Sequence, residues 1–375
     1  MPSRKIVIVG AGIVGLAHAV TARERGFEVT VLERDGRALG ASVRNFGTLW
    51  PIGCAPGRER VQALAGVRRW KELARDAGFW IAPRGSLSLA YREDAWAVLN
   101  EFAHEGDEFE LVGAQEVTRR FPAANGEGLR GALYSAEEAV VQPAAAIAAL
   151  AEYARQLGVA FHFGRPVVKV HDDAVETSDG RRFDFDFLVI AAGDEMRLLF
   201  PEALAQAGLR RCRLQMMRTV PQPAGFDLGA ILVSDLTLCH YPAFRECPST
   251  VKLRARLNAE LPRHGEWGVH VIAAQHPDGS LTLGDSHEYG DDFAPESRAE
   301  VDELILDALR GFARVPDLRI AARWQGVYLK SGDGQTQVIL HPRERVTMVT
   351  AMGGLGMTLS WGLAEETVAS WNRGD

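Results

Sequence analysis

The feature that most constrains the fold of this chain is a glycine-rich turn near the N-terminus. An apolar strand, KIVIV, runs into Gly10, Gly12 and Gly15, and a second strand, EVTVL, follows a long apolar segment. Gly10 permits a tight turn, Gly12 lets the backbone approach a pyrophosphate, and Gly15 lets helix and strand pack closely. The N-terminus of the helix offers unpaired N–H groups to phosphates. The pattern predicts a βαβ unit that binds a dinucleotide.

An acidic residue, Glu33, stands at the tip of the second strand. There its carboxylate can accept hydrogen bonds from both hydroxyls of an adenosine ribose, and it would repel the 2′-phosphate of NADP. Ile13 and Val14 in the turn, and Arg34 after the acid, are expected beside the same nucleotide.

Three later segments favour FAD over NAD. The first is GASVRNFG, residues 40–47, and the second is a buried strand, FDFLVI, that ends in Ala191-Ala192-Gly193. The third is MGGLGMT, residues 352–358, which leads into a last helix, WGLAEETVASW. An NAD enzyme does not need this second glycine-rich helix start, whereas a flavin needs close backbone approach and N–H donors along its ribityl chain and pyrimidine edge.

Together with Val141-Gln142-Pro143 before a helix, these segments resemble the D-amino-acid oxidase superfamily of FAD-dependent oxidoreductases, which includes glycine oxidase, sarcosine oxidase and D-amino-acid dehydrogenase. The resemblance covers nearly the whole chain. Within the superfamily, ASVRNFGTLWPIG looks like a bacterial subgroup associated with aminophosphonate catabolism. The resemblance implies that FAD is held by Gly10, Gly12, Ile13, Val14, Gly15, Glu33, Arg34, Ser42, Arg44, Asn45, Phe46, Gly47, Val168, Ala192, Gly193, Gly353, Gly354, Leu355, Gly356, Met357 and Thr358.

The fold expected from this resemblance is α/β. It has a Rossmann-like FAD-binding domain (1–80, 140–200 and 321–375) and an inserted α+β substrate domain on a mostly antiparallel sheet (81–139 and 201–320). Within these ranges we expect a helix that Pro143 opens at its first turn and a hairpin that turns at Asp278-Gly279. Sarcosine oxidases attach FAD through a cysteine before a tyrosine in a late strand. The corresponding segment here, WQGVY at 324–328, has no cysteine, so we expect noncovalent FAD.

Composition excludes several other classes of protein. The chain has 42 basic and 49 acidic residues, a net charge of −7, which argues against a nucleic-acid partner. It has no apolar run long enough for a transmembrane helix, and the first strand begins at Lys5, leaving no room for a signal peptide. The four cysteines show no CxxC pair and no zinc spacing, so we expect reduced thiols, a cytoplasmic location and no metal site.

The chemistry that the resemblance implies is hydride transfer to the flavin from a C–H beside an amine nitrogen. The protein must orient the substrate and hold its anionic end. In the glycine oxidase branch a Trp-x-Gly-x-Arg segment supplies an arginine that clamps the carboxylate. This chain has Tyr328 in its place, which puts an ordinary α-amino acid in doubt. The candidates for holding a different anion, such as a phosphonate, are Arg44, Tyr328, Lys330, His240, Tyr241, His287 and Tyr289.

Each candidate also has a structural interpretation. Arg44 and Asn45 are also suited to stabilising their own loop. The candidate histidines and tyrosines could equally be ordinary residues at strand ends or at a hairpin end. Other side chains raise the same question. Trp50, Trp324 and Trp361 could line a flavin cavity or belong to the core. The alternating Arg210, Arg211 and Arg213 indicate a solvated face rather than an anion site.

The sequence therefore predicts an FAD-dependent amine oxidase or dehydrogenase for a small amine with an anionic end. The best specific substrate is 2-aminoethylphosphonate or its N-methyl derivative, giving phosphonoacetaldehyde plus ammonia or methylamine. The alternatives are a glycine, sarcosine or D-amino-acid oxidase, and, in another class, a nonenzymatic flavin-binding regulator. The choice between O₂ and an electron carrier as the acceptor stays open.

Overall fold

The computed structural model describes residues 3–106, 108–350 and 352–371 of the chain. Strands from both ends of the sequence meet in one sheet, called here the parallel sheet, with the order β20-β21-β13-β1-β2-β9. Its strands are β1 (Lys5–Val9), β2 (Glu28–Leu32), β9 (Ala160–His162), β13 (Phe187–Ile190), β20 (Val338–Arg343) and β21 (Val346–Thr350). All neighbours are parallel except β20 and β21. The continuous apolar runs in β1 and β13 follow from burial on both faces.

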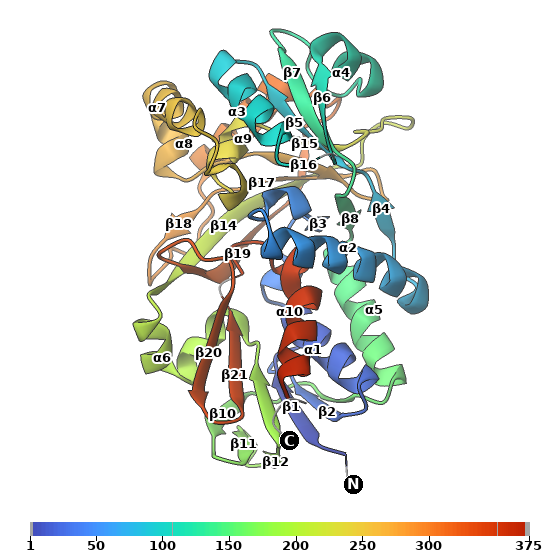
Figure 1. The fold of residues 1–375 in the computed structure, drawn as a ribbon, viewed down its shortest axis with the longest axis vertical. Coiled ribbons are helices and arrows are strands. Elements are labelled where there is room, and N and C mark those ends of the chain that lie inside the picture. The colour runs from blue at the N-terminus through green and yellow to red at the C-terminus, as the bar shows by residue number, and fades with distance from the viewer. Residues whose placement is uncertain (1–2, 107, 351, 372–375) are drawn as a thin grey trace.

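Helices from distant parts of the sequence pack together over the parallel sheet. They are α1 (Ile13–Glu24), α2 (Arg58–Ala77), α5 (Pro143–Gln156) and α10 (Gly356–Ser370). Figure 1 shows α10 lying alongside α1 and below α2. Trp70 of α2 and Trp361 of α10 meet edge to face, with ring centroids 6.1 Å apart, and Trp70 Nε1 donates to the Met357 carbonyl at 2.7 Å. The C-terminal helix is thereby fixed against the N-terminal βαβ unit.

The other half of the molecule is built on a nine-stranded sheet, called here the large sheet. Its order is β18-β14-β17-β16-β15-β5-β7-β6, with β19 on β14. The strands are β5 (Ser86–Ala90), β6 (Phe109–Gly113), β7 (Gly131–Ser135), β14 (Leu209–Thr219), β15 (Ile231–Val233), β16 (Ile272–Gln275), β17 (Leu281–Gly284), β18 (Glu288–Tyr289) and β19 (Ile320–Ser331). Only β5 with β15 is a parallel pair here.

Helices also accompany the large sheet, and they occupy the upper part of Figure 1. They are α3 (Glu93–Ala103), α4 (Ala114–Arg120), α7 (Thr250–Glu260), α8 (Pro262–Glu266) and α9 (Ala299–Phe312). Helix α9 packs Ile305 and Leu309 into a cluster with Leu281 and Leu283 of β17. The helix therefore buries an apolar stripe against the sheet.

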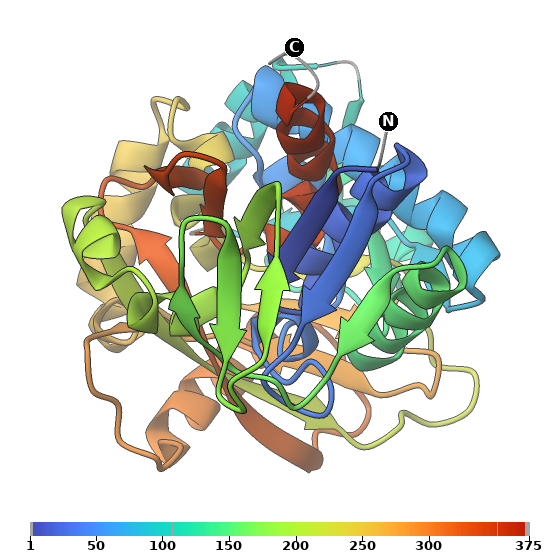
Figure 2. The ribbon, with the colours of Figure 1, turned by 90° about the horizontal axis from the view of Figure 1, so that it is seen from below.

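Two small sheets complete the strand pairing. One is β10 (Val167–Val170), β11 (Ala174–Thr177) and β12 (Arg182–Asp184), which is nearest the viewer in Figure 2. The other joins β3 (Thr48–Leu49), β8 (Ala139–Val141) and β4 (Ile81–Pro83). A short helix, α6 (Pro201–Gln206), precedes β14.

Glu138 ties the two halves together from a fully buried position. Its Oε1 accepts a hydrogen bond from the Ile52 N–H at 3.0 Å, and its Oε2 accepts one from the Ser86 hydroxyl of β5 at 3.1 Å. Burial raises the pKa of this carboxyl, which the hydrogen bonds oppose. The charged form of Glu138 is therefore costly in the fold.

Local sequence predictions are largely confirmed. The α/β class, the first βαβ unit, the helix opened by Pro143 and the hairpin at Asp278-Gly279 are all present. The last helix begins at Gly356, inside the glycine segment rather than after it. The division into domains stays a prediction. Strand β19, which spans the expected boundary at 321, pairs along β14 of the large sheet, and the chain reaches the parallel sheet with β20.

The prediction of a solvated arginine face at 210–213 is wrong for two of its members. Arg213 is only 5% exposed and pairs with Glu288, and Arg211 binds Asp194 at 2.7 Å. The reason is that other segments lie over this face of β14, since Arg211 contacts Asp194 and the Asp291 carbonyl and Arg213 contacts Glu288 and the Ala294 carbonyl.

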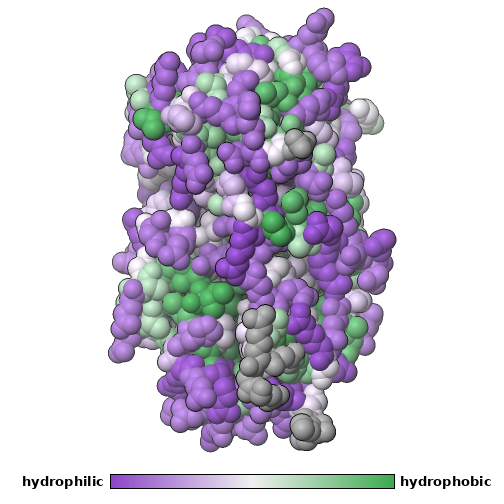
Figure 3. Space-filling model, in the orientation of Figure 1, coloured by the Kyte–Doolittle hydropathy of each residue, from purple (hydrophilic) through white to green (hydrophobic). Residues whose placement is uncertain are grey.

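The face of the molecule in Figure 3 is mainly hydrophilic, with small apolar patches between charged side chains. No helix among the described residues combines the length and the apolar character required to cross a bilayer.

Candidate active site

The turn between β1 and α1 brings three glycines into contacts that a side chain would obstruct. Gly10 has φ +106°, and a Cβ there would lie 2.5 Å from the Ala191 carbonyl oxygen. A Cβ on Gly15 would lie 1.9 Å from the Gly10 oxygen, and one on Gly12 would lie 2.9 Å from Ser42 Oγ. The turn is therefore a cradle that a methyl group would fill. This shape suits close approach by a pyrophosphate.

The start of α1 faces the loop at 40–47. The Ile13 N–H donates to Ser42 Oγ at 2.9 Å, so an oxygen already sits at the donor end of the helix, where phosphate oxygens bind in such turns. One turn after Val14, His18 donates a hydrogen bond from Nδ1 to the Val14 carbonyl at 2.7 Å.

Glu33 lies at the end of β2, as the pattern predicted, with 8% of its surface exposed. Its Oε2 accepts the Ala11 N–H at 2.8 Å and its Oε1 accepts the Asp35 N–H at 3.1 Å. The carboxylate is thus held beside the glycine turn. Arg34 forms an ion pair with Glu195, with Nη1 3.0 Å from Glu195 Oε1.

The loop at 40–47 is shaped by its own side chains and by β19. Asn45 Nδ2 donates to the Ala41 and Ser42 carbonyls, each at 3.0 Å, and its Oδ1 accepts the Gly47 N–H at 2.8 Å. Arg44 is exposed, and its Nη1 donates to the Gln325 carbonyl at 3.1 Å. Both residues therefore have the loop-stabilising contacts of their structural interpretation, and their roles toward FAD or substrate stay predictions.

The remaining predicted FAD residues fall at four places, of which the C-terminal glycine segment is described below. Phe46 is buried, and Gly47 has φ +79° with a Cβ position 2.0 Å from the Val141 oxygen. Ala192 and Gly193 form the turn that follows β13, whereas Val168 lies in β10 with 55% of its surface exposed. No contact of Val168 bears on its predicted role.

The C-terminal glycine segment forms the start of α10. Gly353 and Gly354 have φ +56° and +84°, and Leu355 is the cap that precedes Gly356. A Cβ on Gly354 would lie 3.5 Å from the Tyr328 hydroxyl. The segment therefore meets β19 of the large sheet. The next two residues, Met357 and Thr358, accept hydrogen bonds from the Trp70 indole and from the Trp50 N–H.

Strand register brings three of the predicted anion candidates to one face of the large sheet. Cys212 of β14 stands opposite Tyr328 on one side and Tyr289 on the other. Lys330 follows Tyr328 by two positions, so it lies on the same face. The Lys330 ammonium is 5.9 Å from the centre of the Tyr289 ring.

The other candidates gather beside this row. Tyr241 is buried, with its ring centroid 6.1 Å from Trp50 and 5.0 Å from His240. His240 lies 4.2 Å from His287, centroid to centroid. His240 and Tyr241 thus meet the hairpin end that carries His287, although the sequence did not pair them.

Two neighbours of these residues were missed at the sequence level. His270 lies 4.0 Å from His240 between ring centroids, and Asp285 Oδ1 lies 3.1 Å from His270 Nε2. Little in the sequence distinguishes His270 as a site residue, because it stands in an apolar run, VHVIAA, that is typical of an ordinary strand. The pairing of His270 with Asp285 depends on the register of β16 and β17.

Burial sets the charge states in this region. It lowers the pKa of His270 to about 3, and the positive charge of Lys330 lowers it further. Burial also lowers the pKa of His240 and of His287 well below the usual value, and their neighbouring imidazoles add to the effect. The pKa of Asp285 is raised to about 8 by burial, which Lys330 opposes. Burial lowers the pKa of Lys330 and raises that of Tyr328. The histidines are thus neutral in a buried site.

Two of the three tryptophans belong to the core. Trp361 is 1% exposed and packs against Trp70, and Trp50 is 3% exposed and contacts Tyr241. Trp324 donates its indole N–H to the Arg44 carbonyl at 3.2 Å. A place in a flavin cavity stays a prediction for each of them.

Taken together, the parallel sheet, its glycine cradle and the second glycine turn under β19 define a dinucleotide-cofactor oxidoreductase architecture. A model of the family described as DAO, FAD dependent oxidoreductase, matches residues 5–370. The chain belongs to this family, and its cofactor is FAD.

Individual relatives agree with that assignment. The chain is 26% identical over 370 residues to the tRNA 5-methylaminomethyl-2-thiouridine biosynthesis bifunctional protein MnmC of Maricaulis maris, covering 96% of this chain but only 51% of that protein. It is 25% identical over 347 residues to a glycine oxidase of Bacillus licheniformis, covering 90% and 84% of the two chains. The crystal structure of glycine oxidase from Geobacillus kaustophilus has the same fold, with a TM-score of 0.77 at 18% identity and coverage of 98% and 94%.

Proposed function

We propose that this protein oxidises a small amine with an anionic end, and that the substrate is 2-aminoethylphosphonate or its N-methyl derivative. Support for amine oxidation comes from the relatives named glycine oxidase and from the family itself. Support for the phosphonate comes from the loop ASVRNFGTLWPIG and from the residue that faces the C-terminal glycine turn.

The observation that carries the proposal is the position of Tyr328. Its hydroxyl lies at the junction of the large sheet with the Gly354 turn, where a Cβ on Gly354 would be 3.5 Å away. Lys330 shares its face, and both side chains are half-buried. A neutral phenol and one ammonium replace the bidentate fork that suits a carboxylate. The phenol and the ammonium are two separate donors, which suits the separate oxygens of a phosphonate.

Bound FAD supplies the acceptor for the hydride that leaves the carbon beside the amine nitrogen. The protein's own contribution is to orient that carbon and to exclude water. Tyr328 and Lys330 hold the anionic end, and Tyr241 with Trp50 forms an apolar wall. Loss of a hydride and a proton gives an imine, and water cleaves it to phosphonoacetaldehyde and ammonia or methylamine.

The second candidate is a glycine, sarcosine or D-amino-acid oxidase. The identity to a glycine oxidase over 90% of the chain favours it. In that case the substrate carboxylate is bound by a residue other than Tyr328, which stands where the glycine oxidase branch has its carboxylate-binding arginine. A nonenzymatic flavin-binding regulator is the third candidate, and turnover of any amine contradicts it.

Product analysis tests the proposal. The holoenzyme is incubated in air with a redox dye and with 2-aminoethylphosphonate, its N-methyl derivative, glycine, sarcosine or D-alanine. Phosphorus NMR detects phosphonoacetaldehyde, and an amine assay detects ammonia or methylamine. We expect kcat/KM for the better phosphonate to exceed that for each carboxylate by about tenfold or more, or about 1.4 kcal/mol. Higher kcat/KM for a carboxylate contradicts the proposal.

Substitution at position 328 sharpens the test. Tyr328→Arg restores the fork and should move the kcat/KM ratio toward glycine and sarcosine, whereas Tyr328→Phe should weaken phosphonate turnover without that move. The flavin content of each variant shows whether it folds. An unchanged ratio in a flavin-loaded Tyr328→Arg protein contradicts the role of this residue.

We propose that the enzyme works in the cytoplasm, where its thiols stay reduced. The support is that Cys54, Cys212, Cys239 and Cys247 are all unpaired, and that burial raises the pKa of each thiol.

A further inference from the structure

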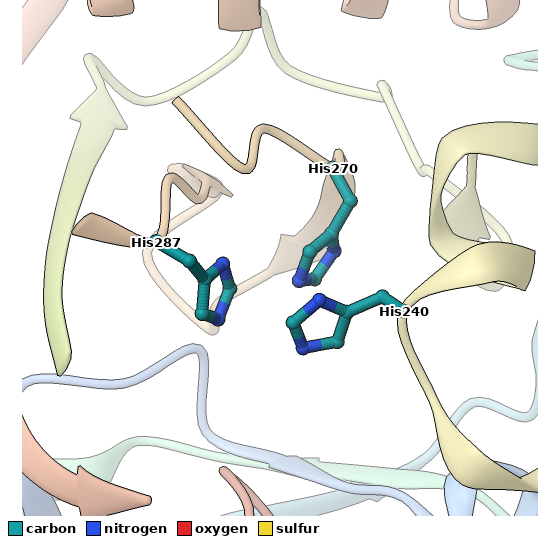
Figure 4. Close-up of side chains that lie close together, drawn as sticks. All are labelled: His240, His270 and His287. Atoms are coloured by element: carbon teal, nitrogen blue, oxygen red, sulfur yellow. The ribbon is translucent and has the colours of Figure 1, made fainter. Parts of the chain in front are cut away.

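Three imidazoles from separate segments converge on one point in the large-sheet half of the molecule. His240 follows the 3-10 turn Asp235–Cys239, His270 precedes β16, and His287 precedes β18. Their candidate ligand nitrogens all lie within 4.8 Å of one another. Figure 4 shows the three rings facing the same space. We call these residues the histidine cluster.

One ring of the histidine cluster has its tautomer fixed by the backbone. His287 Nδ1 lies 3.1 Å from the Gly268 carbonyl oxygen, which can only accept. Nδ1 therefore carries the proton, and Nε2 keeps its lone pair. An N–H that donates to a carbonyl behind a ligand nitrogen is the usual outer-shell arrangement of metal-binding histidines.

A carboxylate beside the cluster lacks a hydrogen-bond partner. Asp285 is 4% exposed, and its Oδ1 lies 3.1 Å from His270 Nε2. The two atoms are not aligned as a hydrogen bond, and both are buried without a partner among the described residues. Buried polar atoms are rarely left in this state. A bound cation would satisfy the imidazole lone pairs.

An entry route reaches the cluster from outside. A cavity of about 150 Å³ is lined by His240 and His270 together with residues of α7 and α8, among them Asn258 and His264. Small ions can therefore reach His240 and His270 through this cavity.

We propose that His240, His270 and His287 bind a divalent transition-metal ion such as Zn²⁺, with Asp285 as the charge-compensating neighbour. Imidazole is a preferred zinc ligand, with Zn–N about 2.0–2.1 Å. Tetrahedral geometry then needs nitrogens about 3.4 Å apart, which is closer than the 4.8 Å limit within which they now lie, so the rings must move together when the ion binds. Three histidines leave a fourth position for an oxygen ligand.

An anion suits the cluster less well than a cation. The proton of His287 is used by Gly268, so the ring presents a lone pair inward, which repels an anion. Lys330 adds a positive charge nearby, and this raises the cost of a cation. Asp285, ionised beside a bound cation, would offset that charge.

The open coordination position suggests what the metal does. It would accept an oxygen of the substrate's phosphonate and supply the positive charge that the arginine replaced by Tyr328 would have given. This role rests on the proposed function. The metal site itself does not, because its test measures bound metal in the absence of substrate.

Metal content tests the site. The holoprotein is stripped with a chelator, incubated with one equivalent of Zn²⁺, passed through a desalting column and analysed by mass spectrometry for metal. We expect about one Zn²⁺ per chain. His270→Gln and His287→Gln should each weaken Zn²⁺ binding by about 100-fold or more and abolish retention on the column.

His264→Gln is the matched control, since His264 lines the same cavity but stands outside the cluster. It should retain Zn²⁺ as the parent does, and flavin absorbance confirms that every variant is folded. No retained Zn²⁺ in the parent, or equal retention in His270→Gln, overturns the proposal. Calorimetric binding of inorganic phosphate to the metal-free protein, lost in His287→Gln, would also overturn it, in favour of an anion site. Failure of the phosphonate assay with Zn²⁺ retained overturns only the proposed substrate.

Discussion

The glycine cradle predicts a specific effect of one methyl group at Gly12. This residue has φ −70° and ψ 175°, which alanine adopts without strain, so the substitution tests space and not backbone conformation. The added Cβ would lie 2.9 Å from Ser42 Oγ, closer than ordinary van der Waals contact. Ser42 must therefore move, and its hydrogen bond from the Ile13 N–H at 2.9 Å is lost.

The methyl group at position 12 should lower both the free energy of unfolding and the affinity for FAD. Loss of the Ile13 hydrogen bond costs about 1 kcal/mol of folding free energy. The methyl also keeps a pyrophosphate from close approach, and we expect this to cost at least about 1.4 kcal/mol of binding free energy, a tenfold weaker Kd for FAD. Gly36→Ala is the control, because a Cβ there meets nothing within 4 Å and its φ is not in the left-handed region.

The assay is titration of the apoprotein with FAD, followed by the quenching of flavin fluorescence. Gly12→Ala should bind FAD at least about tenfold more weakly than the parent, and Gly36→Ala should match the parent within twofold. Equal FAD affinity in Gly12→Ala and the parent would refute the placement of the pyrophosphate at this turn.

Three further predictions concern charge. Lys330→Met should slow reoxidation of the reduced protein by O₂ about tenfold or more while affecting amine reduction less, because a buried positive charge is lost; equal reoxidation rates in stopped-flow would contradict this. Glu138→Gln should gain stability relative to the parent in urea unfolding as pH rises above the usual pKa range of a glutamate, because burial raises the pKa of Glu138 in the folded state and the parent therefore loses stability as pH rises; parallel pH curves would contradict this. Arg256→Met should lower the free energy of unfolding by about 3 kcal/mol at neutral pH. The substitution removes the guanidinium that pairs with Asp94 at 2.7 Å and with Asp235, and leaves both carboxylates without this partner. The lowered pKa of Asp94 means that its stabilisation is lost as pH falls, so the cost should shrink in acid, and a cost independent of pH would contradict the pairing.

The parts of the fold that sequence reasoning predicted are those encoded locally. The turn at Gly10 to Gly15 needs only its own residues, and Pro143 pre-sets the first turn of α5. The hairpin at Asp278-Gly279 is likewise set by a turn that the two residues favour. In each case the physical cause lies within a few residues of the effect.

The candidate site was predicted in part, because its assembly depends on strand register. Tyr328, Lys330 and Tyr289 were named, but that they share a face follows from the pairing of β14 with β18 and β19. His270 and Asp285 were missed because each reads alone as part of a strand or hairpin, and only their pairing across the hairpin brings them together. Arg213 was misjudged because alternation along β14 does not reveal that the segment after β18, with the Phe293 ring and the Ala294 carbonyl, covers its face of the strand.

The most direct test of the proposed amine oxidation is anaerobic mixing of the purified holoprotein with each amine of the panel, followed through the visible absorbance of the flavin. We expect 2-aminoethylphosphonate or its N-methyl derivative to bleach the flavin band faster than glycine, sarcosine or D-alanine. Bleaching by the carboxylates alone would contradict the phosphonate assignment and the role given to Tyr328. A flavin that no amine in the panel reduces would contradict the proposed activity on all of these substrates.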